Sequence, residues 1–265
     1  MMSHPLITTF DQLRAVSSYL NVTFTSPTPD QFTVSEWIDE KTGIFARLYE
    51  AIRAQRHCDD KQYLGMALLD TTWLTTMSSL ACLYATQRFP DLSHENVFYM
   101  VNEESYLREI TLKNPYFYAL STDPDANHPD CIGIFTTFEE LRHHAQTQLE
   151  AHVAPLIDLI KQKTSLGKRA MWSGIADRCA QIIMTVHNLL GKMDVCETEI
   201  AHFLEGSPLK GKTGIQWVTK DDRQHPFLAR GACCLSYKLD GYDYCRTCPL
   251  LNAKEREIKL LETLG

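Results

Sequence analysis

Four of the nine cysteines gather near the end of the 265-residue chain, in the pattern Cys-Cys-x10-Cys-x2-Cys. They are Cys233, Cys234, Cys245 and Cys248, whereas the other five cysteines are scattered singly. So many thiols in one short stretch favour a soft metal partner, either zinc or an iron–sulfur centre. The pattern therefore predicts that the end of the chain forms a loop around a metal site.

The spacing within this pattern bears on the choice of metal. A tight loop across Cys245 and Cys248 aims both sulfurs at one metal ion, which suits zinc and iron–sulfur sites equally. The adjacent side chains of Cys233 and Cys234 point in diverging directions on an extended chain. A two-iron cluster is wider than one zinc ion and offers two attachment points, so this pair favours [2Fe–2S]. Spacing alone still leaves structural zinc and thiol–disulfide exchange open.

The cysteine pattern resembles the C-terminal signature of FhuF-type ferric-siderophore reductases. Two further segments are similar to that family: residues 225–232, which lead into the cysteine pair, and residues 168–173, which contain Trp172 and Ser173. In that family we expect Asn after Trp-Ser, whereas this chain has Gly174, so no role of that side chain is carried over. The resemblance covers about residues 140–250, and before them only the length matches.

The resemblance implies a function and a set of site residues. The four clustered cysteines would hold a [2Fe–2S] cluster, which passes one electron to a chelated Fe(III) and so releases Fe(II) from a siderophore, with the hydroxamate type favoured. Such an enzyme needs no catalytic residue beyond its cluster. We place the chelate pocket beside the cysteine loop, lined by Trp172 and Arg230. The alternatives are a non-enzymatic, zinc-stabilised binding protein and a simple [2Fe–2S] electron carrier.

Charge and motifs disfavour other classes of partner. The chain has 33 acidic and 26 basic residues, a formal net charge of −7, which disfavours nucleic acid. Residues 206–213 satisfy the phosphate-binding pattern G-x4-G-K-[ST]. A working loop of this type follows a strand and opens a helix, but here a helix is predicted before it and a strand after it. We therefore expect no nucleotide cofactor and a ferredoxin-like or other external electron donor.

Cysteine usage and the N-terminus predict a cytoplasmic location. The N-terminal residues lack the charged lead and apolar run of a secretion signal, and nine cysteines then indicate a reducing compartment. The most apolar stretch, residues 66–85, is interrupted by Asp70 and several hydroxyl side chains, so it does not predict a membrane span. Peripheral association with a membrane stays open.

The chain alternates between helical and strand-like periodicity, which predicts an α+β fold. We expect a predominantly helical body, a small antiparallel sheet and a C-terminal iron–sulfur cysteine loop. We expect two parts: a siderophore-binding body over residues 1–225 and a cluster-binding segment over residues 226–265. Helices are predicted over residues 10–20, 35–52, 60–87, 138–163, 169–190, 196–204 and 252–264, and strands over residues 97–101, 107–112, 116–120, 131–135, 215–219 and 226–229.

Overall fold

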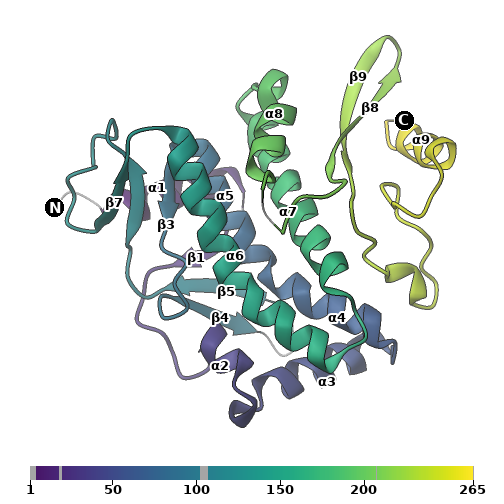
Figure 1. Ribbon diagram of the computed structural model, residues 1–265, viewed down its shortest axis with the longest axis horizontal. Helices are drawn as coiled ribbons and strands as arrows, with labels where there is room; N and C mark the ends of the chain where they lie inside the picture. The colour runs from purple at the N-terminus through teal and green to yellow at the C-terminus, as the bar shows by residue number, and fades with distance from the viewer. Residues whose placement is uncertain (1–3, 18–19, 102–106, 207, 265) are drawn as a thin grey trace. The chain divides into compact units, whose positions relative to one another are not determined.

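The computed structural model describes residues 4–17, 20–101, 107–206 and 208–264, which fold into two compact units (Figure 1). The first unit comprises Met1–Gln55 and Asp70–Leu159, and the second comprises Arg56–Leu69 and Ile160–Gly265. The predicted α+β class is confirmed, because helices predominate over small sheets and the clustered cysteines lie in a C-terminal loop. The functional division at residue 225 stays a prediction.

The first unit contains most of the strands. Its helices and 3-10 turns are α1 (Pro5–Val16), α2 (Val34–Ile38), η1 (Glu40–Thr42), α3 (Ile44–Arg56), η2 (Asp70–Thr72), α5 (Trp73–Thr86) and the greater part of α6 (Phe138–Lys163). Its strands are β1 (Val22–Thr23), β2 (Phe32–Thr33), β3 (Arg88–Pro90), β4 (Val97–Val101), β5 (Leu107–Leu112), β6 (Phe117–Leu120) and β7 (Cys131–Phe135).

These strands form two sheets rather than one. The first has the order β1-β5-β4-β2, in which only β1 and β5 are parallel, and the second has the order β3-β6-β7, in which β6 and β7 are parallel. Both sheets are therefore mixed, where the sequence predicted a single antiparallel one. The parallel pairs are β1 with β5 and β6 with β7. Strand β1 is too short to leave a periodic signal, and periodicity does not encode the direction in which the predicted strands β6 and β7 pair.

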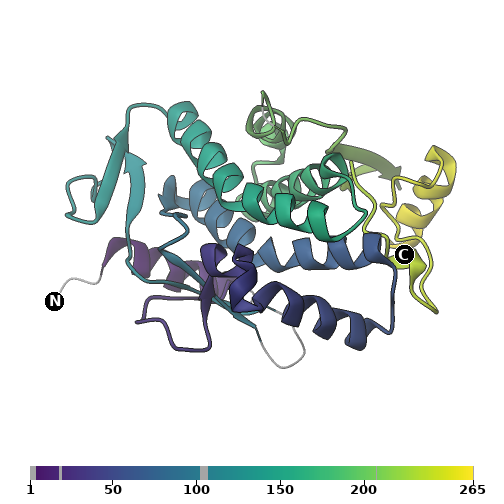
Figure 2. The same ribbon diagram turned by 60° about the horizontal axis from the view of Figure 1, so that its bottom comes forward.

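A buried hydrogen-bonded chain joins the first sheet to two helices. Tyr99 in β4 accepts a hydrogen bond from Thr75 Oγ1 of α5 at 2.9 Å and contacts His152 Nε2 of α6 at 2.5 Å. The opposite ring nitrogen of His152 donates to the carbonyl of Leu92 at 2.8 Å. Both helices thus contact strand β4 through Tyr99, and Figure 2 shows them on one side of this sheet.

The second unit consists of helices, one hairpin and the long loop that contains the clustered cysteines. It contains α4 (Lys61–Leu69), α7 (Lys168–Leu189), α8 (Met193–Phe203), β8 (Gly214–Lys220), β9 (Arg223–Ala229), η3 (Ser236–Lys238) and α9 (Ala253–Glu262). Asp221 and Asp222 connect β8 to β9 with φ values of 49° and 59°, the left-handed geometry that a two-residue hairpin turn requires. Asn252 and Glu255 form a capping box that starts α9.

Three predicted helices differ most from the observed ones, whereas the others match or differ by one to three residues at their ends. The first begins at Pro5 rather than near Phe10, because His4 accepts a hydrogen bond from Leu6 N–H and caps the helix. The helix predicted over residues 35–52 is interrupted by η1, which ends at Gly43 with a φ of 68°. The helix predicted over residues 60–87 is divided by η2 into α4 and α5. Within the described residues, no helix combines the length and apolar character needed to span a membrane.

Candidate metal centre

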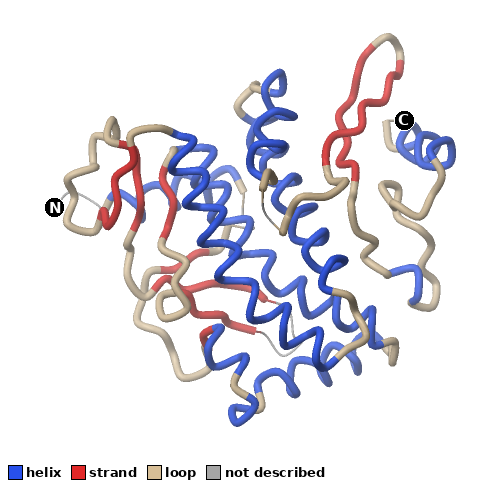
Figure 3. The backbone as a smooth tube through the Cα atoms, in the orientation of Figure 1, coloured by secondary structure: helices blue, strands red, loops and turns tan. Residues whose placement is uncertain are grey.

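The four clustered cysteines lie in the segment between β9 and α9, which is almost entirely loop (Figure 3). Cys233 Sγ lies 3.9 Å from Cys248 Sγ, and the thiol of Cys234 forms hydrogen bonds with the thiols of Cys233 and Cys245. The sulfurs therefore form one continuous chain of contacts from Cys248 through Cys233 and Cys234 to Cys245. Cys248 is buried, and the other three cysteines are half-buried.

Local turns of the backbone direct these sulfurs toward one another. The amide of Cys248 donates to the carbonyl of Cys245 at 3.0 Å, which closes the tight loop predicted for Cys-x-x-Cys. After the cysteine pair, Leu235 adopts a φ of 62°, and its amide donates to Cys233 Sγ at 3.4 Å. Amide donors of this kind stabilise thiolate charge, so the backbone is already arranged for anionic sulfur.

Polar contacts outside the cysteines anchor the loop within the second unit. Lys238 Nζ contacts Asp60 Oδ2 at 2.8 Å and Gln62 Oε1 at 2.9 Å, which ties η3 to the start of α4. Arg256 in α9 donates to Gln216 Oε1 at 2.9 Å and to the carbonyl of Cys248 at 3.4 Å. The loop is thus fixed by α4 on one side and by α9 on the other.

Asp177 in α7 fixes the approach to the cysteine pair. Its carboxylate accepts hydrogen bonds from the amides of Gly231 at 2.7 Å and Ala232 at 3.1 Å. Thr213 Oγ1 donates to it at 2.6 Å, and Arg230 Nε lies 3.4 Å away. The other end of the Arg230 guanidinium lies 3.8 Å from Cys245 Sγ.

The charges around the thiols influence one another. Hydrogen bonds from Cys233 and Cys245 lower the pKa of Cys234 far below its ordinary value, and the same contacts raise the pKa of both partners. Burial acts to lower the pKa of Arg230, but Asp177 and the thiols of Cys234 and Cys245 outweigh it and raise that pKa. Arg230 is therefore a permanent cation beside the sulfurs.

This donor set fits a cluster bound by four cysteine thiolates. [2Fe–2S] clusters take four such ligands, and the chain places four sulfurs in mutual contact with backbone and guanidinium donors next to them. When bound, such a cluster supplies one-electron transfer. The residues that could hold it are the four that the sequence predicted.

The other predicted site residues lie in the same unit. Arg230 is brought to the thiols, as described above. Trp172 lies half-buried near the start of α7, and its role stays a prediction. At Gly174, an added Cβ would lie 3.3 Å from Met66 Sδ, so a methionine of α4 occupies the space where a longer side chain would extend.

Asp177 and Thr213 were missed by the sequence reasoning. Thr213 is the last residue of the phosphate-binding pattern, which lies between α8 and β8 in the order predicted from the sequence; Ser207 lies outside the described residues. Asp177 leaves little signal in the sequence, because it is one of several polar and charged residues of α7.

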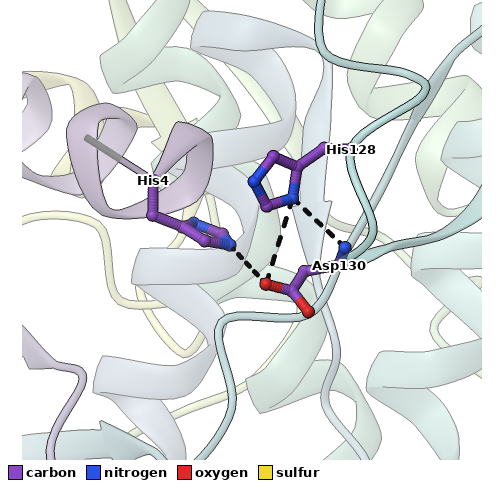
Figure 4. Close-up of side chains that lie close together, drawn as sticks. All are labelled: His4, His128 and Asp130. Atoms are coloured by element: carbon purple, nitrogen blue, oxygen red, sulfur yellow. Dashed lines mark hydrogen bonds and ion pairs between the residues drawn. The ribbon is translucent and has the colours of Figure 1, made fainter. Parts of the chain in front are cut away.

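A second group of potential metal ligands lies in the first unit, where His4, His128 and Asp130 bring ligand atoms within 4.8 Å of one another (Figure 4). His4 Nε2 donates to Asp130 Oδ2 at 3.0 Å, while its Nδ1 accepts from Leu6 N–H. His128 Nδ1 accepts from the amide of Asp130 at 3.1 Å. A neutral imidazole has one nitrogen lone pair that can bind a metal, and in both His4 and His128 this lone pair accepts a hydrogen bond. We therefore interpret the group as a structural contact between α1 and the turn before β7.

Comparison with known proteins supports the assignment of the cysteine loop. Residues 230–250 match the FhuF 2Fe-2S C-terminal domain, and the four cysteines of that region fit its motif. No curated protein matches the chain. The predicted resemblance is thus confirmed for the cysteine loop, and [2Fe–2S] is the cofactor that this segment indicates.

Proposed function

We propose that the chain is a ferric-siderophore reductase, which reduces a chelated Fe(III) to Fe(II) in the cytoplasm and so releases the iron. In this proposal Cys233, Cys234, Cys245 and Cys248 bind the [2Fe–2S] cluster. The observation that carries it is the convergence of these four thiols within residues 230–250, the region that matches a FhuF domain.

The stoichiometry of the reaction suits such a protein. Reduction of Fe(III) to Fe(II) consumes one electron, and a [2Fe–2S] cluster delivers electrons singly. Siderophores bind iron through hard oxygen donors such as hydroxamate, which prefer the trivalent ion. Reduction therefore weakens the chelate, and Fe(II) dissociates without acid–base chemistry at the protein.

The chain's own residues would bring the chelate and the sulfurs together. Three of the four cysteines are half-buried, so the thiol side of the loop is accessible to a partner. Arg230 presents a fixed cation beside Cys245, and Trp172 offers an apolar ring at the start of α7. We propose these two side chains as contacts for the siderophore.

The electron would arrive from outside the chain. The sequence contains no dinucleotide-binding fingerprint, so we propose a ferredoxin-like or other external electron donor. The protein could meet this donor during peripheral association with a membrane. The donor and the siderophore would use the accessible thiol side in turn.

Two measurements test this function in order. The visible spectrum of anaerobically purified protein should show a red-brown chromophore that bleaches with dithionite; a colourless protein that stays colourless after reconstitution with iron and sulfide would point to zinc. The reduced protein is then mixed with a ferric hydroxamate and an Fe(II)-specific chelator. We expect about one Fe(II) per cluster, from the one-electron chemistry of the cofactor, and a rate that saturates with chelate. A rate without saturation would indicate a simple electron carrier.

A further inference from the structure

A buried carboxylate connects α7 to the cysteine loop. The side chain of Asp177 is 4% exposed. Its Oδ1 accepts hydrogen bonds from Thr213 and Gly231, and its Oδ2 accepts from Ala232 and faces Arg230. A buried charge needs compensation of this kind, and here most of the donors belong to the three residues before Cys233.

The fit between Asp177 and the loop leaves no room for a side chain at residue 231. A Cβ added to Gly231 would lie 2.7 Å from Thr213 Oγ1 and 3.5 Å from Asp177 Oδ1. Glycine therefore permits the backbone to approach the carboxylate closely. The contact between Asp177 and the backbone at Gly231 therefore depends on the absence of a side chain as well as on the charge of the carboxylate.

Arg230 continues the connection to the sulfurs. Its Nε faces Asp177 at 3.4 Å, and its Nη1 lies 3.8 Å from Cys245 Sγ. A guanidinium is planar and rigid, so a carboxylate that holds one edge determines where the opposite edge lies. The position of the positive charge next to Cys245 is thus set by a residue on a different element.

We propose that Asp177 is a positioning residue for the iron–sulfur centre, which acts through Arg230 and through the backbone before Cys233. It holds the Arg230 charge against Cys245 and thereby raises the reduction potential of the cluster. The inference rests on the cysteine assignment in the proposed function, but it does not depend on the identity of any ferric chelate.

The test is a double-mutant cycle on the reduction potential of the cluster-loaded protein, measured by spectroelectrochemical titration. R230Q should lower the potential, because it removes a positive charge beside a centre that gains an electron. D177N removes a negative charge, which by itself raises the potential, but it also releases Arg230. We expect the shift caused by D177N to be more negative with Arg230 present than in the R230Q background.

Additive shifts would overturn the proposal, because Asp177 would then act only as a distant charge. D240N is the matched control: Asp240 is an exposed acid in the same loop, and its shift should be equal in both backgrounds. The potential is measured without siderophore, so this test stays valid even if the protein proves to have no reductase activity. A wild-type protein without a chromophore would instead disprove the assignment of the cysteines as cluster ligands.

A second readout applies if D177N does not take up a cluster. The far-UV circular dichroism of the apoprotein reports whether the chain keeps its helical content, and amide hydrogen exchange at Gly231 and Ala232 reports the backbone contact. Folded D177N with faster exchange at these two amides supports the positioning role. Unchanged exchange contradicts it. T213V, which keeps the charge of Asp177 and removes one hydrogen bond, should load the cluster and show an intermediate exchange rate.

Discussion

Cys233 Sγ lies 3.9 Å from Cys248 Sγ across fifteen residues of chain, while the adjacent Cys234 bonds to Cys245 as well as to Cys233. The two neighbouring cysteines thus contact different distant partners, but their thiols also contact each other, so they do not diverge as they would on an extended chain. The separation is too long for a disulfide and leaves the sulfurs free to bind a metal centre.

We expect Cys245→Ser to abolish the visible chromophore. Removal of one thiolate leaves a four-ligand cluster without its full coordination, and serine oxygen is a harder donor than sulfur. The measurement is the iron and sulfide content per chain after anaerobic reconstitution. Cys58→Ser, which changes a half-buried cysteine outside the loop, is the control and should keep the full content.

We expect the fold to survive removal of the iron. The contacts of Lys238 with Asp60, of Arg256 with Gln216 and of Asp177 with the loop amides involve no sulfur. After oxidation and chelation, the helical circular dichroism signal should stay the same while the colour disappears. A large loss of helical signal would show that the cluster itself maintains the second unit, as in small metal-dependent domains.

We expect Gly65→Ala to destabilise the protein by about 1–3 kcal/mol, the usual cost of overpacking. In α4, an added Cβ would lie 2.8 Å from Thr164 Oγ1 and 3.2 Å from Ile160 Cγ2. Gly214→Ala is the matched control, because no heavy atom lies within 4 Å of an added Cβ there. Urea unfolding of both variants would test the difference, and equal stabilities would contradict the close approach at Gly65.

We expect stability to fall as the pH is lowered from about 6.5 to about 4. Burial lowers the pKa of His152 from 6.5 to about 4, against a raising effect of its bond to the Leu92 carbonyl and a further lowering by His94. The unfolded chain then binds more protons than the folded one in this range, so stability is complete above about 6.5 and decreases toward 4. Integrated over that range, the effect amounts to about 3 kcal/mol.

His152→Gln provides the comparison for this pH effect. The variant loses the hydrogen bond to Tyr99 and should be less stable than the wild type at pH 7.5. It should also lose less stability on acidification, because the titrating group is gone. Parallel curves of unfolding free energy against pH would show that other groups cause the acid sensitivity.

The strongly periodic elements could be predicted from sequence. Helix α6 was predicted over residues 138–163 and occupies those residues, and β4, β5 and β7 were also predicted with their observed bounds. Each has a repeated apolar pattern over its whole length. Breaks between helices were harder to predict: η2 divides a stretch that was predicted as one helix, and its Thr71 and Thr72 are buried like most residues of α4 and α5.

The clustering of the four thiols could be predicted from the sequence, whereas the residues that support them could not. Four cysteines at close spacing leave a clear pattern in the sequence. Asp177 does not, because its partners are backbone amides 54 and 55 residues away, and amides are present at nearly every position. The supporting residues therefore became visible only when the chain was folded.

The anchoring of the cysteine loop by contacts that contain no sulfur has a consequence for the lifetime of the protein in a cell. Iron–sulfur centres are damaged by oxidants, whereas hydrogen bonds to Asp177 and ion pairs such as Lys238 with Asp60 are not. If the fold survives the loss of iron as expected, and the thiols stay reduced, the same four sulfurs are again available to bind metal. Repair then requires only new iron, sulfide and electrons, and no new polypeptide.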